Sequence, residues 1–106
     1  MGQGSDKSGL FIEGTEEQKL VDRVRAAVGG DALALAELFA CFRMPLLRLC
    51  LSFSGIGQAD AQDLVQETFI RAHKGLGGLR EPERFAGWIF AICRRRCLSW
   101  LEGQGR

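Results

Sequence analysis

Glycine clusters divide this chain into segments whose apolar residues recur every three or four positions. The breaks fall at Gly29 and Gly30, at residues 54–57, and at Gly75, Gly77 and Gly78. A spacing of three and four marks one face of an α-helix, whereas a half-buried strand alternates every second residue. Glycine commonly ends helices because it adopts backbone conformations that other residues avoid. The pattern predicts an all-α fold, a compact bundle of four short helices without strands.

The first two predicted helices begin at residues that can cap them. Thr15 with Gln18 resembles a capping box and starts a helix that reaches about Val28. Asp31 is the expected cap of the second helix, in which Pro45 predicts a kink or a restart because proline lacks a backbone donor. The sides expected to face the core are Leu20, Val21, Val24 and Val28, then Leu35, Leu38, Phe39, Phe42, Leu46, Leu49, Cys50 and Phe53.

The third and fourth predicted helices span about residues 59–76 and 84–101, joined by a charged connector that contains Pro82. Apolar residues expected to line the fourth helix are Phe85, Trp88, Ile89, Ile92, Cys93, Leu98 and Leu101. We expect one core cluster of Leu38, Phe39, Phe42, Leu64, Phe69, Trp88, Ile89 and Ile92. Residues 1–14 are expected to be a disordered tail, 15–102 one helical domain and 103–106 the start of a linker.

Charge is nearly balanced over the whole chain, with a formal net charge of +1, but it is unevenly distributed. From residue 80 to the end there are six arginines against three glutamates. Residues 58–70 hold three acidic residues and no basic one. The distribution predicts that the last helix faces phosphate and that the third helix faces a basic protein surface.

No apolar run approaches the roughly 20 residues that span a bilayer, and the N-terminus lacks the apolar core of a signal peptide. Gly2 follows Met1, but Asp6 stands where a myristoylation signal needs Ser or Thr. The expected compartment is the cytosol, where thiols stay reduced. One histidine and no glycine-rich phosphate loop leave nothing for an active site, so we expect neither an enzyme nor a cofactor.

The cysteines of the chain are Cys41, Cys50, Cys93 and Cys97, and no two form a Cys-x-x-Cys pair. Cys93 and Cys97 lie one helical turn apart, so with His73, the only histidine, they could form part of a zinc site. We favour the alternative that the cysteines are small buried side chains, because free cysteine is among the most buried residue types.

Two blocks of the sequence resemble region 2 of the sigma-70 family of bacterial RNA polymerase sigma factors, in its extracytoplasmic-function (ECF) branch. The first is DAQDLVQETFIRAH at residues 60–73, and the second is FAGWIFAICR at residues 85–94. The upstream AELF at residues 36–39, followed by Pro45 and Leu46, also fits the second helix of that family. The resemblance covers about residues 16–101 and implies a helical bundle that binds core RNA polymerase.

In the family, the third helix docks on the coiled-coil clamp helices of the polymerase β′ subunit. This role transfers to Asp63, Gln66 and Glu67, which are expected to be exposed on one face. Carboxylates and an amide there can pair with arginines of a basic coiled coil. The alternative is that these acids only stabilise the start of a helix through its dipole.

The family's connector and fourth helix open and read the promoter −10 element, and a flipped base enters a pocket at the connector. By position, the resemblance assigns DNA contacts to Arg80, Arg84, Trp88, Arg94, Arg95 and Ser99. Arginines bind phosphates, and aromatic rings stack on unpaired bases. Core positions for Phe85 and Trp88, and a solvated face for the arginines at 94–96, are the alternatives. We expect Arg94 and Arg95 to form an exposed patch near Arg84, with Arg96 turned towards the bundle.

The sequence departs from the family pattern at several positions. Gln62 replaces a usual Glu, Arg95 a usual Asn and Ser99 a usual Asp, while Arg96 stands at a usually apolar place. The helix-turn-helix that follows in complete ECF factors is not expected within these residues. A second hypothesis is therefore an interaction module that binds polymerase or an anti-sigma factor without reading DNA.

Overall fold

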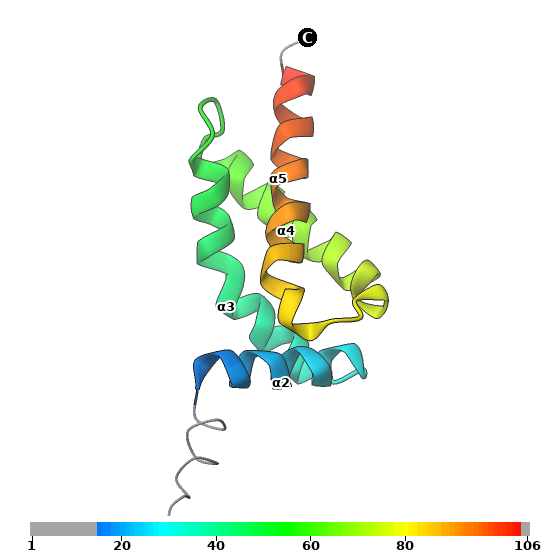
Figure 1. Cartoon of the computed structure of the whole chain (residues 1–106). Helices are drawn as coiled ribbons and strands as arrows, with labels where there is room; N and C mark the ends of the chain where they lie inside the picture. The colour runs from blue at the N-terminus through cyan, green and yellow to red at the C-terminus, as the bar shows by residue number, and fades with distance from the viewer. Residues whose placement is uncertain (1–14, 105–106) are drawn as a thin grey trace, which may run out of the picture.

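The computed structural model describes residues 15–104, and all of their regular structure is helical. The helices are α2 (Glu16–Val28), α3 (Ala32–Leu51), α4 (Gln58–Gly75) and α5 (Phe85–Gln104) (Figure 1). Two short 3-10 turns, η1 (Leu76–Gly78) and η2 (Pro82–Arg84), lie between α4 and α5. The all-α fold with four helices is confirmed for these residues. The expected tail at residues 1–14 and the last two residues, 105–106, lie outside the described part.

Local capping signals fix the starts of α2 and α3. Thr15 Oγ1 accepts a hydrogen bond from the backbone N–H of Gln18 at 3.0 Å. Asp31 Oδ1 accepts from the N–H groups of Leu33 and Ala34 at 3.0 and 3.1 Å. The turn between these helices depends on Gly30, whose φ of 104° is rarely adopted by other residues. Both predicted caps are therefore confirmed.

Pro45 does not restart the second helix, since α3 is one continuous helix from Ala32 to Leu51. An interior proline costs about 3 kcal/mol because it removes a backbone hydrogen bond and crowds the preceding turn. Phe42 and Leu46 flank Pro45 and are both buried. Burial of such a side chain contributes about 1.5–3 kcal/mol, so the two together offset the cost. Tertiary packing therefore keeps α3 helical on both sides of Pro45.

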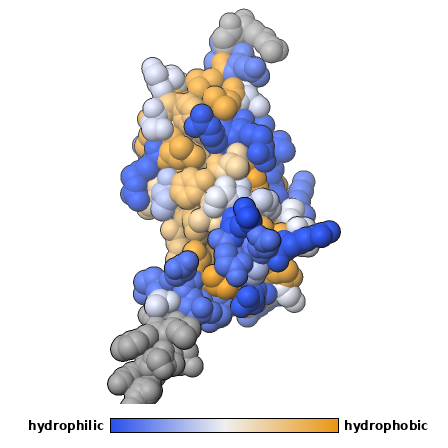
Figure 2. Space-filling view, in the orientation of Figure 1, coloured by the Kyte–Doolittle hydropathy of each residue, from blue (hydrophilic) through white to orange (hydrophobic). Residues whose placement is uncertain are grey.

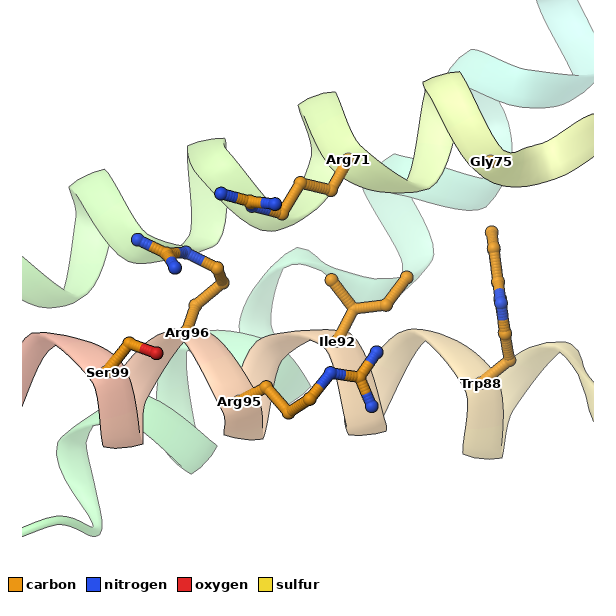
Figure 3. A pocket seen from close by; sticks show the side chains of 7 residues that line it. All are labelled: Arg71, Gly75, Trp88, Ile92, Arg95, Arg96 and Ser99. Atoms are coloured by element: carbon orange, nitrogen blue, oxygen red, sulfur yellow. The ribbon is translucent and has the colours of Figure 1, made fainter.

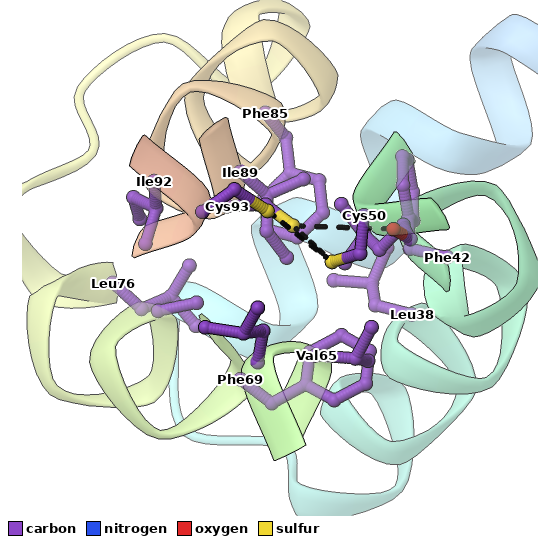
Figure 4. Packing of buried hydrophobic residues seen from close by; sticks show 14 of the residues in the cluster. Leu38, Phe42, Cys50, Val65, Phe69, Leu76, Phe85, Ile89, Ile92 and Cys93 are labelled. Atoms are coloured by element: carbon purple, nitrogen blue, oxygen red, sulfur yellow. Dashed lines mark hydrogen bonds between the residues drawn. The ribbon is translucent and has the colours of Figure 1, made fainter. Parts of the chain in front are cut away.

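All four helices contribute to one hydrophobic core (Figure 4). Phe39 and Phe69 stack with their ring centroids 4.3 Å apart, which joins α3 to α4. Phe42 meets Phe85 edge to face at 5.3 Å, which joins α3 to α5. The predicted cluster is confirmed, with Phe39 and Trp88 half-buried against it and the other members buried.

Two residues expected in the core are exposed, and α5 is longer than predicted. Val28, at the last position of α2, is 37% exposed, and Leu98 is 44% exposed. Cys97 occupies the buried position, and Leu98 lies about 100° further round the helix, where it faces solvent. The predicted end at Leu101 is three residues too early, because α5 continues through Gly103 to Gln104.

Helix α4 packs against both α3 and α5, whereas α2 lies across one end of the bundle beside η2 (Figure 1). In the same orientation, apolar side chains gather over α3 and α5, and the end near α2 is largely hydrophilic (Figure 2). None of the helices in residues 15–104 has the length and apolar character to cross a membrane. One side of α4 faces α3 and another faces α5, so α4 borders a separate surface with each of these helices.

Candidate functional site

A basic groove runs between α4 and α5 (Figure 3). Its hollow has a volume of about 420 Å³ and is lined by Arg71, Gly75, Trp88, Ile92, Arg95, Arg96 and Ser99. We call this the α4–α5 groove. Three of its lining side chains are guanidinium groups, which bind phosphate and other anions.

Helical spacing explains how the sequence builds the α4–α5 groove. On α5, Trp88, Ile92, Arg95 and Ser99 follow one another at four, three and four residues, so they share one stripe. On α4, Arg71 and Gly75 are four residues apart and face that stripe. The resemblance had selected Trp88, Arg95 and Ser99 but not Arg71. The basic charge and spacing of Arg71 could have pointed to it.

An ion pair between Arg96 of α5 and Glu67 of α4 joins the two helices of the groove at its edge. The Nε and Nη2 atoms of Arg96 donate to Oε1 of Glu67 at 3.1 and 3.0 Å. The Arg96 side chain is only 25% exposed, and that of Glu67 is 46% exposed. The predicted inward orientation of Arg96 is confirmed. Glu67 was expected to be exposed beside Asp63 and Gln66; it is half-buried, and its carboxylate accepts hydrogen bonds from an arginine of the neighbouring helix.

Trp88 belongs to the groove and also to the packing beneath it. Its ring lies 5.8 Å from that of Phe85, centroid to centroid. A Cβ added at Gly75 would come within 3.4 Å of Trp88 Cζ2, so the indole rests against the end of α4. Phe85 is fully buried, which confirms the core alternative for that residue. Trp88 is half-buried and still lines the groove.

A second hollow, of about 440 Å³, lies at the connector before α5. It is lined by Leu79, Glu83, Arg84, Gly87 and Trp88. Trp88 therefore borders this connector hollow as well as the α4–α5 groove. Arg84 is exposed and forms an ion pair with Glu81, which raises the pKa of the Arg84 guanidinium. Arg80 is exposed on the same connector.

The structure separates Arg94 from Arg95. Both are exposed as expected, but Arg95 lines the α4–α5 groove while the guanidinium of Arg94 lies 6.0 Å from the ring centre of Phe53. Consecutive helical residues point about 100° apart, so the two arginines serve different surfaces. The prediction that they form one patch near Arg84 is therefore wrong.

On the other side of α4, a third hollow of about 440 Å³ lies against α3. It is lined by Arg43, Met44, Leu47, Gln62, Asp63, Val65 and Gln66. We call this the α3–α4 hollow. Asp63 and Gln66 are exposed there, as predicted. Met44, which is 53% exposed, and Leu47 were missed because they lie off the core stripe of the second helix.

Cys50, Cys93 and Cys97 meet in the core between α3 and α5. The Sγ atom of Cys50 lies 3.4 Å from that of Cys93 and 3.5 Å from that of Cys97. The contact between Cys50 and Cys93 raises the pKa of Cys50 and lowers that of Cys93, and burial raises the pKa of Cys97. The buried-thiol prediction is confirmed for these three and wrong for Cys41, which is exposed.

His73 is not part of this cluster. It is exposed and lines a different hollow, with residues of α2, α3, η1 and the turn between α2 and α3. The combination of Cys93, Cys97 and His73 considered from the sequence is therefore wrong, because Cys50 from α3 occupies the position next to the two thiols of α5.

Comparison with known proteins assigns the family. Residues 38–106 match the family Sigma-70 region 2. The chain is 33% identical over 91 residues to the RNA polymerase sigma-H factor of Pseudomonas aeruginosa, covering 86% of this chain and 45% of that protein. It is 29% identical over 96 residues to the ECF RNA polymerase sigma-E factor of Haemophilus influenzae, covering 91% of this chain and 48% of that one.

A third relative is the ECF RNA polymerase sigma factor SigM of Mycobacterium tuberculosis, 31% identical over 89 residues, which cover 84% of this chain and 45% of that protein. No solved structure matches the chain. The chain spans about half the length of these curated relatives. The matched residues include α4 and α5, which carry both blocks of the resemblance. The chain therefore belongs to the sigma-70 family of RNA polymerase sigma factors, in its ECF branch, through region 2.

Proposed function

We propose that this chain is the module of an ECF sigma factor that binds core RNA polymerase and recognises the promoter −10 element at transcription initiation. The observation that carries the proposal is the α4–α5 groove, in which arginines and a tryptophan lie along the helix that the family uses for DNA. The module acts by binding and is not an enzyme. Its place of action is the cytoplasm, with the polymerase.

The proposed DNA surface follows one stripe of α5. Trp88, Arg95 and Ser99 of α5 succeed one another at helical spacing, with Arg84 of η2 four residues before Trp88. Arg71 of α4 adds a positive charge from across the groove. Extruding a base from a duplex costs a few kcal/mol. Stacking on an aromatic ring contributes about 1–3 kcal/mol per base, and the arginine–phosphate contacts add to it. These contributions together can offset the cost of opening the strands.

The connector hollow is the proposed pocket for the flipped base. It lies between Glu83, Arg84 and Trp88, directly before the DNA stripe. Arg80 and Arg84 are exposed beside it and would contact the sugar-phosphate backbone. Arg94 would reach phosphate from the flank of α5, outside the groove.

The proposed polymerase surface is the α3–α4 hollow. Asp63 and Gln66 present an exposed carboxylate and amide to basic residues of the β′ clamp helices. Met44 and Leu47 add apolar area at the same place, which interfaces bury at their centre. Glu67 contributes less directly, because its carboxylate already accepts from Arg96.

Anisotropy titrations test the proposal. A fluorescent single strand of random sequence and a duplex of equal length are titrated with the chain, with core polymerase and with their complex. We expect the complex to bind the single strand more tightly than core alone and to prefer it over the duplex. Core binding without any gain in single-strand affinity would reject DNA recognition and favour an interaction module that binds polymerase or an anti-sigma factor.

A further inference from the structure

Three cysteine thiols from two helices converge at one point in the core. Cys50 ends the buried stripe of α3, and Cys93 and Cys97 lie one turn apart on α5 (Figure 4 labels Cys50 and Cys93). Each of the three is 0% exposed, and their Sγ atoms all lie within 4.8 Å of one another. None of them is in a disulfide. Nothing in the proposed binding of polymerase or DNA uses this cluster.

The spacing of the sulfur atoms suits a metal centre. With metal–sulfur bonds of about 2.3 Å, sulfur atoms of a tetrahedral or trigonal site lie about 3.8–4.0 Å apart. The distances from Cys50 Sγ to Cys93 Sγ and to Cys97 Sγ, 3.4 and 3.5 Å, need to widen by only a few tenths of an ångström. A disulfide would use two of the thiols and leave the third unexplained, whereas a metal centre uses all of them.

We propose that Cys50, Cys93 and Cys97 form a thiolate site for a soft metal ion, and that the ion is monovalent copper. Thiolate sulfur selects soft ions such as copper(I) and zinc. Structural zinc sites take four protein ligands. Within residues 15–104, the only candidate metal ligands grouped at this point are the three cysteines. The nearby hydroxyl of Thr68 already donates a hydrogen bond to the carbonyl of Leu64 at 2.8 Å. Copper(I) is satisfied by three sulfur ligands.

Binding would connect the metal to the fold. Binding releases the thiol protons, and the single positive charge of the ion offsets part of the cost of burying the thiolates, which is high in an apolar core. It would hold the end of α3 against the middle of α5, the helix that carries the proposed DNA stripe. Because the site has no exposed surface, the ion enters only when the core opens, so loading is expected to be slow or to require refolding with the metal.

The test is an anaerobic titration of the reduced chain with copper(I) in competition with a chromogenic copper(I) chelator, after refolding with the metal. Wild type and the control Cys41→Ser, which alters the exposed cysteine, should bind one equivalent with the same affinity. Cys50→Ser, Cys93→Ser and Cys97→Ser should each weaken binding by about tenfold or more. Unchanged affinity in these variants, or loss in Cys41→Ser alone, would overturn the site.

Thermal unfolding of the wild type tests copper(I) binding even if the serine variants fold poorly. Copper(I) should raise the unfolding midpoint of wild type and of Cys41→Ser, since an ion that binds only the folded state stabilises it. An absence of any shift with copper(I) overturns the proposal. A larger shift with zinc than with copper(I) overturns the choice of ion.

Discussion

Arg96 of α5 and Glu67 of α4 join the two helices of the α4–α5 groove through a single carboxylate oxygen, Oε1, at 3.0 and 3.1 Å. The pair lies at the edge of the groove that is proposed to bind DNA, and Glu67 belongs to α4, the helix that also carries the proposed polymerase contacts. Replacement of either residue therefore acts on the relative position of α4 and α5 as well as on local charge. Stability and binding must be measured together at these positions.

A double-mutant cycle on Glu67→Ala and Arg96→Ala should give a coupling free energy on the order of 0.5–1 kcal/mol, measured by chemical denaturation. The value is modest because the Glu67 side chain is 46% exposed and its charge is partly screened. The matched control is the pair Lys19 and Glu16, 3.8 Å apart and exposed by 52% and 94%, which should show almost no coupling. Equal coupling in both pairs would contradict a structural role for the Arg96–Glu67 contact.

Phe85→Ala should lower the free energy of unfolding by about 3–5 kcal/mol, because the ring is fully buried and contacts Phe42 and Trp88. Leu98→Ala on the same helix is the control and should change it by no more than about 0.5 kcal/mol, since Leu98 is 44% exposed. Denaturant unfolding curves check both values. A larger loss from Leu98→Ala than from Phe85→Ala would contradict the described face of α5.

Asp63→Lys should weaken the affinity for core polymerase at least about tenfold, because it places a positive charge against a basic partner. The unfolding midpoint should stay nearly unchanged, since Asp63 is exposed. Glu102→Lys introduces the same charge change at an exposed position near the end of α5 and should leave the affinity unchanged. Titration with labelled core polymerase measures the affinity of both variants. Equal losses of affinity in Asp63→Lys and Glu102→Lys would show that only overall charge matters.

Arg95→Ala should reduce single-strand affinity more than Arg94→Ala does, because Arg95 lines the α4–α5 groove and Arg94 lies over Phe53. For Arg95→Ala, the plot of log affinity for the single strand against log salt concentration should become less steep, since fewer counterions are released on binding. Core affinity should stay as in the wild type for both variants. A stronger effect from Arg94→Ala would move the proposed DNA surface to the other side of α5.

The sequence predicts the helices of this fold well because their signals are local. Asp31 and Thr15 cap the helices that follow them, and the stripe from Leu38 to Phe42 faces the core as its spacing indicates. The error at Leu98 arose where the apolar pattern offered two neighbouring positions and Cys97 took the buried one.

The contacts between helices could not be predicted from the sequence. Glu67 and Arg96 are 29 residues apart, and nothing local indicates that their helices bring them together. The same holds for Cys50, which lies 43 residues before Cys93. Such pairs depend on the rotation and register of packed helices, which the tertiary structure sets. Met44 joined the α3–α4 hollow for the same reason.

The most direct test of the account is selection from a random single-stranded DNA library by the complex of this chain with core polymerase. We expect enrichment of one short sequence, absent with core alone and strongly reduced with Arg95→Ala, which keeps its affinity for core. Firm binding of the chain to core with no enriched sequence would contradict recognition of the −10 element through the α4–α5 groove.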